Sequence, residues 1–236
     1  MNKLIVVTGG TKGIGRAIIE KFSSHGFDVA TCSRSQNDLD SLKVMLQKLN
    51  NTTNTFIQRA DMSDKTEVKL FCEFVKKLNR PVDVLVNNAG HFLPGEIVTE
   101  PEGTLENMIN ANVYSAYYTT RGIVPQMKIA KRGHIFNMCS IASFMAYPNG
   151  GSYAISKFAL LGFSKCLREE LKDFGIRVTA VMPGATKTAS WEGVDIPEER
   201  FIKVEDIADT VYAAYAISGR SVVEELVIRP QLGDIR

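Results

Sequence analysis

Three side chains of this sequence could together move a proton. Tyr153 and Lys157 stand four residues apart, and Ser140 precedes the tyrosine by thirteen positions. Residues four apart on a helix share a face, so the phenol and the ammonium can point into one site. The pKa of a free tyrosine is near ~10, and a cation held beside the phenol favours the phenolate. Because a serine hydroxyl can hold a carbonyl oxygen next to the phenol, the set suits proton transfer to that oxygen while a hydride reaches the carbon.

A glycine-rich segment near the start indicates where the hydride comes from. Residues 8–15, Thr-Gly-Gly-Thr-Lys-Gly-Ile-Gly, follow an apolar run at 3–7 that predicts a buried strand, and precede residues 16–22, which predict a helix. This order is the context of a dinucleotide fingerprint, in which glycines let the backbone approach a pyrophosphate and a helix N-terminus attracts it. The alternative is a tight turn without a ligand. A nucleoside-triphosphate loop is disfavoured, because no Gly-Lys-Ser/Thr occurs.

The residues after the second predicted strand favour NADP over NAD. An NAD site usually has an acidic residue about ~20 residues beyond the glycines. Residues 29–37 contain no Asp or Glu, and Arg34 lies there instead. Together with Lys12 it could pair with a 2′-phosphate through charge-assisted hydrogen bonds. The alternative is that both cations are solvated surface charges.

Composition and charge exclude several other classes of function. The net charge of +2 over 236 residues gives no indication of a nucleic-acid or membrane partner. The three histidines are scattered and the cysteines form no Cys-x-x-Cys, so we expect no metal site. The chain shows no signal peptide and no apolar run near ~20 residues, which predicts a cytoplasmic protein. We expect buried thiols at Cys32, Cys72, Cys139 and Cys166.

Strand and helix patterns alternate along the whole chain. Strands are predicted at 3–8, 27–32, 54–59, 82–87, 133–138, 176–182 and 222–228, and helices near 13–25, 36–50, 63–79, 104–130, 152–174 and 204–218. The strands are mostly continuous apolar runs, which indicates a parallel sheet covered on both faces. The predicted fold is therefore α/β, a single Rossmann-type doubly wound parallel sheet of about seven strands with helices on both faces. One domain is expected over 1–236, with a cofactor part at about 1–130 and a catalytic and substrate part at about 131–236.

Several ordered motifs resemble the short-chain dehydrogenase/reductase family over almost the whole chain. Besides the glycine turn, they are Asp61-Met62, Asn87-Asn88-Ala89-Gly90, Asn112, the Ser140–Tyr153–Lys157 set, and the segment 183–188, Pro-Gly-Ala-Thr-Lys-Thr. The resemblance implies a catalytic tetrad of Asn112, Ser140, Tyr153 and Lys157. Tyr153 would be the general acid in reduction, Lys157 would lower its pKa and bind the nicotinamide ribose, and Asn112 would sit on a water relay. Asn112 could instead satisfy a helix backbone group, and Ser140 could cap a strand end.

The glycine turn, the two cations and these motifs together define an expected NADP site. Its residues are Gly9, Thr11, Lys12, Gly13, Ile14, Gly15, Ser33, Arg34, Asp61, Met62, Asn88, Ala89, Gly90, Tyr153, Lys157, Pro183, Gly184, Thr186 and Thr188. In the resemblance Asp61 approaches the adenine ring, and a threonine of 183–188 meets the nicotinamide carboxamide.

The substrate side is expected to consist of Ser140, Tyr153 and Trp191. Segments 91–103 and 184–203 follow strands and should overhang the crevice; the second is shorter than in many family members. Trp191 could stack on a planar substrate ring or pack against the neighbouring helix. Trp191 and the tail at 222–235 resemble bacterial sepiapterin reductase-like members, which act on a pterin side-chain carbonyl.

The function predicted is an NADPH-dependent carbonyl reductase acting on a small molecule, with a pterin ketone as the first substrate. The alternative is a 3-oxoacyl-[acyl-carrier-protein] reductase or another short-chain alcohol dehydrogenase; its carrier would need a basic entrance, for which the candidates are Arg121, Lys128, Lys131 and Arg132. Those cations could equally be a solvated helix end. A non-catalytic NADPH-binding sensor is a third hypothesis, and the intact tetrad argues against it.

By analogy with the family, we expect a homodimer or homotetramer formed through the long helices near 104–130 and 152–174. Three aromatic residues on the first helix could belong to that interface or to the core: Tyr114, Tyr117 and Tyr118.

Overall fold

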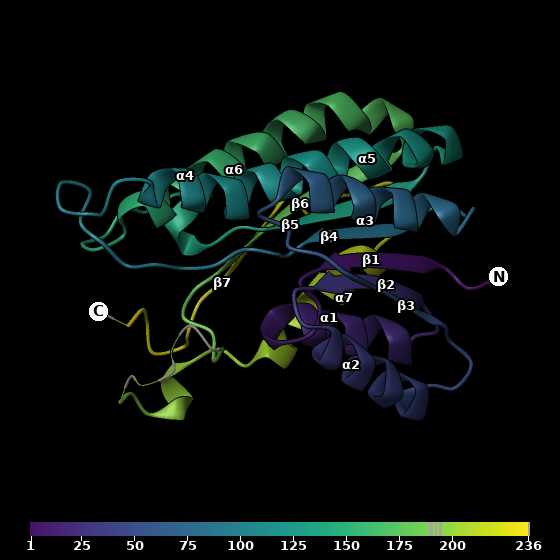
Figure 1. Ribbon diagram of the computed structural model, residues 1–236, viewed down its shortest axis with the longest axis horizontal. Coiled ribbons are helices and arrows are strands. Elements are labelled where there is room, and N and C mark those ends of the chain that lie inside the picture. The colour runs from purple at the N-terminus through teal and green to yellow at the C-terminus, as the bar shows by residue number, and fades with distance from the viewer. Residues whose placement is uncertain (189–190, 192, 194, 236) are drawn as a thin grey trace.

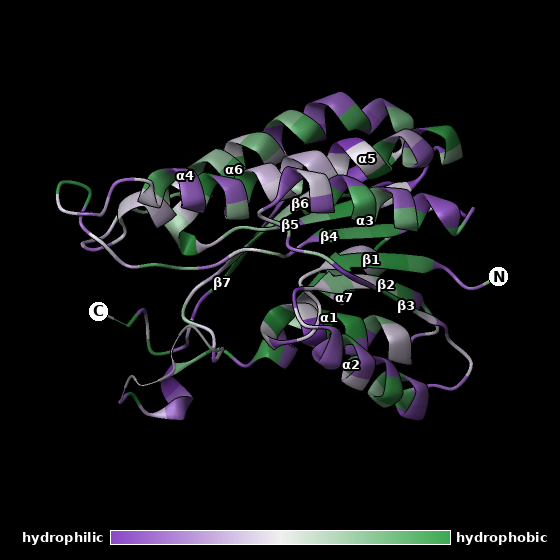
Figure 2. Ribbon diagram, viewed as in Figure 1, coloured by the Kyte–Doolittle hydropathy of each residue, from purple (hydrophilic) through white to green (hydrophobic). Residues whose placement is uncertain are grey.

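Seven parallel strands form one sheet in the order β3-β2-β1-β4-β5-β6-β7 (Figure 1). A computed structural model describes residues 1–188, 191, 193 and 195–235. The strands are β1 Leu4–Thr8, β2 Asp28–Ser33, β3 Thr55–Arg59, β4 Val84–Asn87, β5 Gly133–Met138, β6 Ile176–Pro183 and β7 Glu225–Ile228. Strands β1, β4 and β6 are apolar and almost entirely buried. Figure 2 shows the hydrophobic residues at the centre of the sheet. The predicted doubly wound α/β fold is thereby confirmed.

Helices cover both faces of the sheet (Figure 1). On one face lie α1 Gly13–Ser24, α2 Gln36–Leu49 and α7 Val204–Ala216. On the other lie α3 Lys65–Lys77, α4 Thr104–Ile109, the π-helical turn η1 Asn110–Tyr114, α5 Ser115–Ala130 and α6 Gly151–Leu171. Short 3₁₀ turns occur at η2 Ile141–Ser143, η3 Lys172–Phe174 and η5 Glu198–Arg200.

Each interface is closed by a cluster of buried side chains. On the α1/α7 face, Phe22 meets Phe27 and Tyr212 edge-on at centroid distances of 5.0 and 5.2 Å. On the other face, Phe71, Val75 and Ile123 pack beneath β1 and β4. Burial of this kind stabilises the fold by about 1.5–3 kcal/mol per large apolar side chain.

The order in which strands are added to the sheet reverses at β1: β2 and β3 lie on one side of it, and β4, the next strand of the chain, lies on the other. In open α/β sheets ligands bind at such a switch point, outside the carboxyl ends of the strands. The glycine turn follows β1 and the Asn-Asn-Ala-Gly segment overlaps the end of β4, so both motifs reach this point.

Two sequence predictions need correction. The helix predicted at 104–130 is interrupted by η1, because one π-helical turn at Asn110–Tyr114 replaces regular α geometry. Cys166 is exposed rather than buried, because it lies on the solvent side of α6, between exposed Lys165 and buried Leu167.

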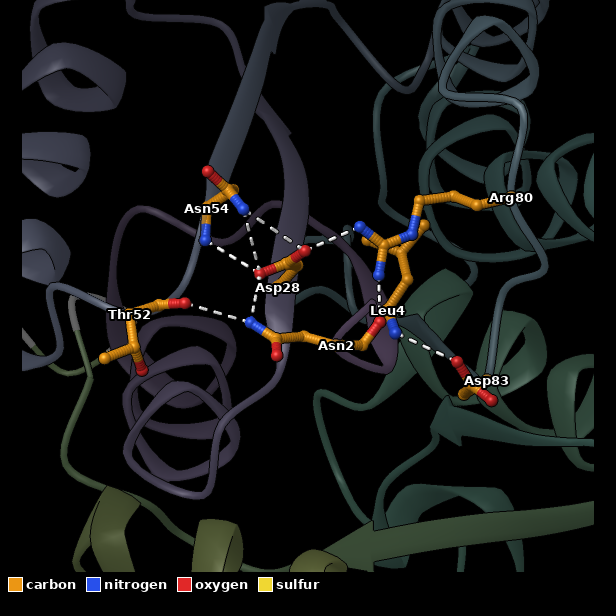
Figure 3. A network of polar contacts seen from close by, with 7 residues as sticks. All are labelled: Asn2, Leu4, Asp28, Thr52, Asn54, Arg80 and Asp83. Carbon is orange, nitrogen blue, oxygen red and sulfur yellow. Dashed lines mark hydrogen bonds and ion pairs between the residues drawn. The ribbon is translucent and has the colours of Figure 1, made fainter.

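The opposite edge of the sheet, where the strands begin, holds a closed polar network (Figure 3). Asp28 is only 1% exposed. Its carboxylate accepts from Arg80 Nη1 at 2.5 Å, Asn54 N at 2.8 Å and Asn2 Nδ2 at 3.0 Å. Nearby, Asp83 accepts from the backbone N–H of Leu4 at 2.9 Å. These contacts join the starts of β1 and β2 to the chain before and after them.

Within the described part of the chain, no helix is both long and apolar enough to cross a bilayer.

Candidate active site

The glycine turn after β1 leaves room for a ligand next to the backbone. Gly9 and Gly13 have φ angles of +68° and +54°, which disfavour side chains other than glycine. A Cβ on Gly15 would lie 2.4 Å from Asn88 Nδ2 and 2.6 Å from the carbonyl oxygen of Gly9. The N-cap of α1, Lys12, makes no side-chain cap bond, and the first turn of α1 contains no acidic residue. Such a helix N-terminus can accept the phosphates of a dinucleotide.

The end of β4 braces this turn. Asn88 Nδ2 donates to the carbonyl oxygens of Thr8 at 2.9 Å and Gly9 at 3.0 Å. In return, Thr8 Oγ1 accepts the backbone N–H groups of Asn88 and Ala89, both at 3.0 Å. The two motifs therefore form one rigid unit, and Asn88 and Gly90 also line the cavity described below.

The residues expected at the ribose end gather at the end of β2. Thr11 Oγ1 donates to Ser33 Oγ at 3.2 Å, and Arg34 beside them is exposed. Lys12, also exposed, pairs with Asp38 of α2, with Nζ 3.1 Å from Oδ2. Asp38 was not predicted as part of the site, since it comes one position after residues 29–37, the range without an Asp or Glu. Of the two cations predicted for this end of the site, Lys12 is held in an ion pair with Asp38, and Arg34 is the other.

Asp61 and Met62 occupy different surroundings. Burial raises the pKa of Asp61, but hydrogen bonds from Ser63 and the charges of Arg34 and Arg59 outweigh it, so the pKa is lowered. Asp61 is thus an anion near Arg34. The Met62 side chain is 6% exposed and belongs to the core. Without repacking, its backbone is the part that could meet an adenine.

The proton-transfer residues meet at one cavity. Tyr153 and Lys157 lie on α6, and Ser140 directly precedes η2. All three line a cavity of about 840 Å³. Lys157 is 7% exposed, and its Nζ donates to the carbonyl oxygen of Met138 at 2.7 Å. The same nitrogen lies 5.6 Å from the centre of the Tyr153 ring.

Burial dominates the ionisation of this pair. It raises the pKa of Tyr153, although the neighbouring Ser140 hydroxyl acts in the opposite direction. It lowers the pKa of Lys157 to about 8. The expected lowering of the tyrosine pKa is therefore not found here, because desolvation of the phenolate outweighs the hydrogen bond with Ser140. A phenol with a raised pKa is protonated at neutral pH, as a general acid must be.

Ser140 and Asn112 each have a structural role beside the expected one. Ser140 Oγ accepts the N–H of Ala142 at 3.2 Å, and Ser143 Oγ accepts the N–H of Ser140 at 3.2 Å, a capping box around η2. Asn112 is 1% exposed and exchanges two hydrogen bonds with the His91 backbone, of 2.9 and 3.1 Å. Its Nδ2 also donates to Ser156 Oγ at 2.9 Å. Asn112 thus joins η1 to α6.

The Pro-Gly segment at the end of β6 also lines the cavity. Thr186 and Thr188 line it together with Pro183 and Gly184. A Cβ on Gly13 would lie 3.3 Å from Thr188 Cγ2, so this threonine stands beside the cofactor turn. Trp191 also lines the cavity, and its ring meets Phe201 edge-on at 5.1 Å. The packing partner of Trp191 is thus Phe201, which lies between η5 and α7, and stacking on a substrate ring stays a prediction.

The cavity lining also includes residues that were not among the predicted site residues; the polar and aromatic ones include His91, Phe92, Tyr147, Arg229 and Asp234. Arg229 Nε donates to Asp234 Oδ1 at 3.1 Å. No spacing rule brings the C-terminal tail to this cavity, since its position depends on how the chain leaves β7. The prediction that segment 91–103 overhangs the crevice covered His91 and Phe92 without selecting them individually.

The basic residues proposed as a carrier entrance lie elsewhere. Arg132 Nε pairs with Asp83 at 3.2 Å, at the edge where the strands begin, and Lys128 lies over Phe174 at 4.3 Å. Lys131 directly follows the end of α5, two positions before β5 begins. Arg121 donates to Tyr117 Oη at 3.1 Å within α5. The solvated-helix interpretation fits these positions better than an entrance to the cavity.

Fold, glycine cradle and the Tyr–Lys–Ser cavity agree with one family, and the family model for short chain dehydrogenase matches residues 3–198. The chain belongs to the short-chain dehydrogenase/reductase family, a class of oxidoreductases.

Among curated proteins, the chain is 32% identical to a sepiapterin reductase of Chlorobaculum tepidum, over 100% of this chain and 99% of that protein. Among solved structures, an alcohol dehydrogenase of the archaeon Thermococcus sibiricus, in complex with 5-hydroxy-NADP, has a TM-score of 0.92 and 26% identity over 99% of both chains. A metagenomic short-chain oxidoreductase in complex with NADP has a TM-score of 0.84 and 29% identity over 97% of both chains.

Proposed function

We propose that this chain is an NADPH-dependent carbonyl reductase. The observation that carries the proposal is a shared cavity. Tyr153, Lys157 and Ser140 line the same space as Asn88 and Thr188, which stand beside the glycine turn. A carbonyl in that space can contact the proton donor and the cofactor together.

The chain's own residues would carry the proton and orient the ketone. Bound NADPH supplies a hydride for the carbonyl carbon. Tyr153, protonated because burial raises its pKa, donates its proton to the carbonyl oxygen as negative charge develops there. The Ser140 hydroxyl holds that oxygen beside the phenol. Lys157 would bind the nicotinamide ribose and place a positive charge beside the phenol. Asn112 fixes η1 against α6. A water relay behind Lys157 is the proposed route by which the proton of Tyr153 is replaced.

Lys12 and Arg34 support NADP as the cofactor. Both side chains are exposed, Lys12 next to Thr11 before α1 and Arg34 next to Ser33 at the end of β2, where a 2′-phosphate could pair with them. The pair between Lys12 and Asp38 is exposed, and exposed pairs contribute only about 0–1 kcal/mol, so a phosphate can compete for Lys12.

A pterin side-chain ketone is the substrate we propose. The cavity combines aromatic surfaces at Trp191 and Tyr147 with the carboxylate of Asp234. A flat heterocycle can stack on the former, and its amino and ring N–H groups can donate to the latter. The sepiapterin reductase of C. tepidum supports this choice. The 3-oxoacyl thioester remains the alternative substrate, without a basic entrance at the positions first considered.

Initial rates of NADPH and NADH oxidation with sepiapterin, an acetoacetyl thioester and a simple diketone test the proposal. We expect NADPH-dependent turnover with sepiapterin. Turnover confined to the thioester would replace the pterin assignment, and turnover preferring NADH would overturn the assignment of Lys12 and Arg34. If the wild type binds NADPH but reduces no carbonyl, the sensor hypothesis replaces the enzyme.

We also propose a homodimer or homotetramer built on α5 and α6. Tyr114, Tyr117, Ile155 and Phe158 are exposed on η1, α5 and α6. Light scattering at micromolar concentration should give a multimeric mass, and a monomeric mass would refute the proposal.

A further inference from the structure

A carboxylate from a distant loop caps the helix that carries Tyr153 and Lys157. The backbone N–H of Ser152 donates to Glu100 Oε1 at 2.8 Å, and the Ser152 hydroxyl donates to the other carboxylate oxygen. The helix's own N-cap, Gly150, has no side chain to offer. Glu100 therefore takes over the function of an N-cap, and its negative charge complements the positive end of the helix dipole.

Two glycines make room for this contact. A Cβ on Gly151 would lie 1.7 Å from Glu100 Oε1, and a Cβ on Gly95 would lie 2.8 Å from Glu100 Cγ. The N–H of Gly95 donates to the carbonyl oxygen of Asn149 at 3.0 Å. The loop after β4 is therefore attached to the start of α6 by both its backbone and a side chain, in a space that larger residues would close.

The same loop contacts the catalytic residues directly. The Phe92 ring meets Tyr153 edge-on, with centroids 4.8 Å apart and an interplanar angle of 81°. Before it, His91 is held by the two hydrogen bonds to Asn112. On the α6 side, Tyr147 and Asn149 line the cavity just before the capped turn. Glu100 thus joins two walls of the cavity at the residue that precedes Tyr153.

We propose that Glu100 is a positioning residue for carbonyl reduction. It fixes the first turn of α6 and the segment 145–149 against the loop 91–103, so that the Tyr153 hydroxyl meets the substrate oxygen at the correct place. This inference rests on the proposed carbonyl reductase activity. NADPH binding should depend on it little, because the glycine turn and α1 are held by Thr8 and Asn88 instead.

Kinetics of Glu100→Ala, Glu100→Gln and Ser152→Ala test the proposal, with Glu102→Ala as the matched control. Glu102 is exposed on the same loop. Glu100→Ala should lower kcat/KM for the ketone by on the order of 10- to 100-fold, mainly through kcat, because small misplacements of reacting groups are costly. The Kd of NADPH should stay within about twofold, since the phosphate-binding helix N-terminus is untouched. Glu100→Gln can still accept from the Ser152 N–H and should recover most of the activity. Ser152→Ala, which removes one of the two bonds, should fall between Glu100→Ala and the wild type.

Hydrogen exchange of peptides covering 145–157 supplies a readout that needs no turnover. It should be faster in Glu100→Ala than in Glu102→Ala. If the wild type reduces no carbonyl, the proposed function fails while exchange still decides whether Glu100 holds α6. Exchange and kinetics of Glu100→Ala equal to those of Glu102→Ala would overturn the positioning role. Parallel loss of NADPH binding and of stability would also overturn it, in favour of a general folding role. Should Glu100→Ala fail to fold, Ser152→Ala and Glu100→Gln decide by the same measurements.

Discussion

The edge of the sheet where the strands begin and the edge where they end differ in how their buried polar groups are paired. Where the strands begin, Asp28 is enclosed by Arg80, Asn54 and Asn2, which neutralise and hydrogen-bond its carboxylate (Figure 3). Where the strands end, the Tyr153 and Ser140 groups face a cavity, and Lys157 is buried with its pKa lowered. Burying charge is unfavourable unless it is paired. Where the strands begin, the buried charge of Asp28 is paired within the protein. Where they end, the polar groups face the cavity, and a bound ligand can supply further partners.

The largest expected effect is the loss of reduction in Tyr153→Phe without a loss of stability. Tyr153→Phe removes the proposed proton donor and keeps the ring that contacts Phe92. NADPH-dependent reduction should fall by about 10²–10⁴-fold. NADPH binding and the urea midpoint should not change. A variant that keeps wild-type rates would show that another group donates the proton.

A substitution at the edge where the strands begin should lower stability and leave catalysis unchanged. Arg80→Met leaves the buried Asp28 carboxylate without its cation. The free energy of unfolding should fall by about 3 kcal/mol, at the low end for a broken buried pair because Asn2 and Asn54 remain. Urea unfolding measures it, with Arg132→Met as the control at the same edge. That pair with Asp83 is exposed at the arginine and should contribute less than about 1 kcal/mol. Equal losses in the two variants would contradict the comparison.

The pH dependence of reduction should follow the ionisation of Tyr153 and Lys157, the groups at the edge where the strands end. In the proposed mechanism Tyr153 and Lys157 both act in their protonated forms. Burial raises the pKa of Tyr153, so its proton remains, and lowers that of Lys157 to about 8, so its charge disappears as pH rises through that value. We expect kcat/KM for NADPH-dependent reduction to be level below pH ~7 and to decline with a midpoint near pH 8, whereas alcohol oxidation, which needs the phenolate, should increase with pH. A decline on the acidic side would assign the titration to another group.

Cofactor preference gives the next smaller effect. Lys12→Ala and Arg34→Ala should each raise the KM for NADPH by about 10-fold, the equivalent of one charge-assisted hydrogen bond, and leave that for NADH unchanged. An equal change for both cofactors would remove the 2′-phosphate from the explanation.

The smallest expected effect concerns the ion pair between Lys12 and Asp38 and its influence on the KM for NADPH. Asp38→Asn frees Lys12 from its exposed ion pair and should lower the KM for NADPH by about two- to threefold, within the range of surface pairs. An increased KM would mean that Asp38 orients Lys12 rather than competing for it.

Local patterns in the sequence were sufficient for the strands, the glycine turn and the placement of Ser140, Tyr153 and Lys157 at one cavity. Contacts between residues distant in sequence were not predictable in this way. Glu100 and Ser152 are 52 positions apart, and their meeting depends on how the loop after β4 folds back. The direction of the Tyr153 pKa also depends on burial, which spacing does not specify. Exposure of Cys166 depends on which side of α6 faces solvent.

The π-helical turn at Asn110–Tyr114 constrains the number of residues in this part of the chain. A π turn holds one residue more than the α turn it replaces, and each residue of an α-helix adds about 100° of rotation. Deleting one residue from this turn would therefore rotate Asn112 away from His91 and Ser156 relative to α5. During divergence, substitutions in the turn can accumulate while its length stays fixed. An alignment gap beside Asn112 should accordingly mark a relative that joins its loop to α6 in another way.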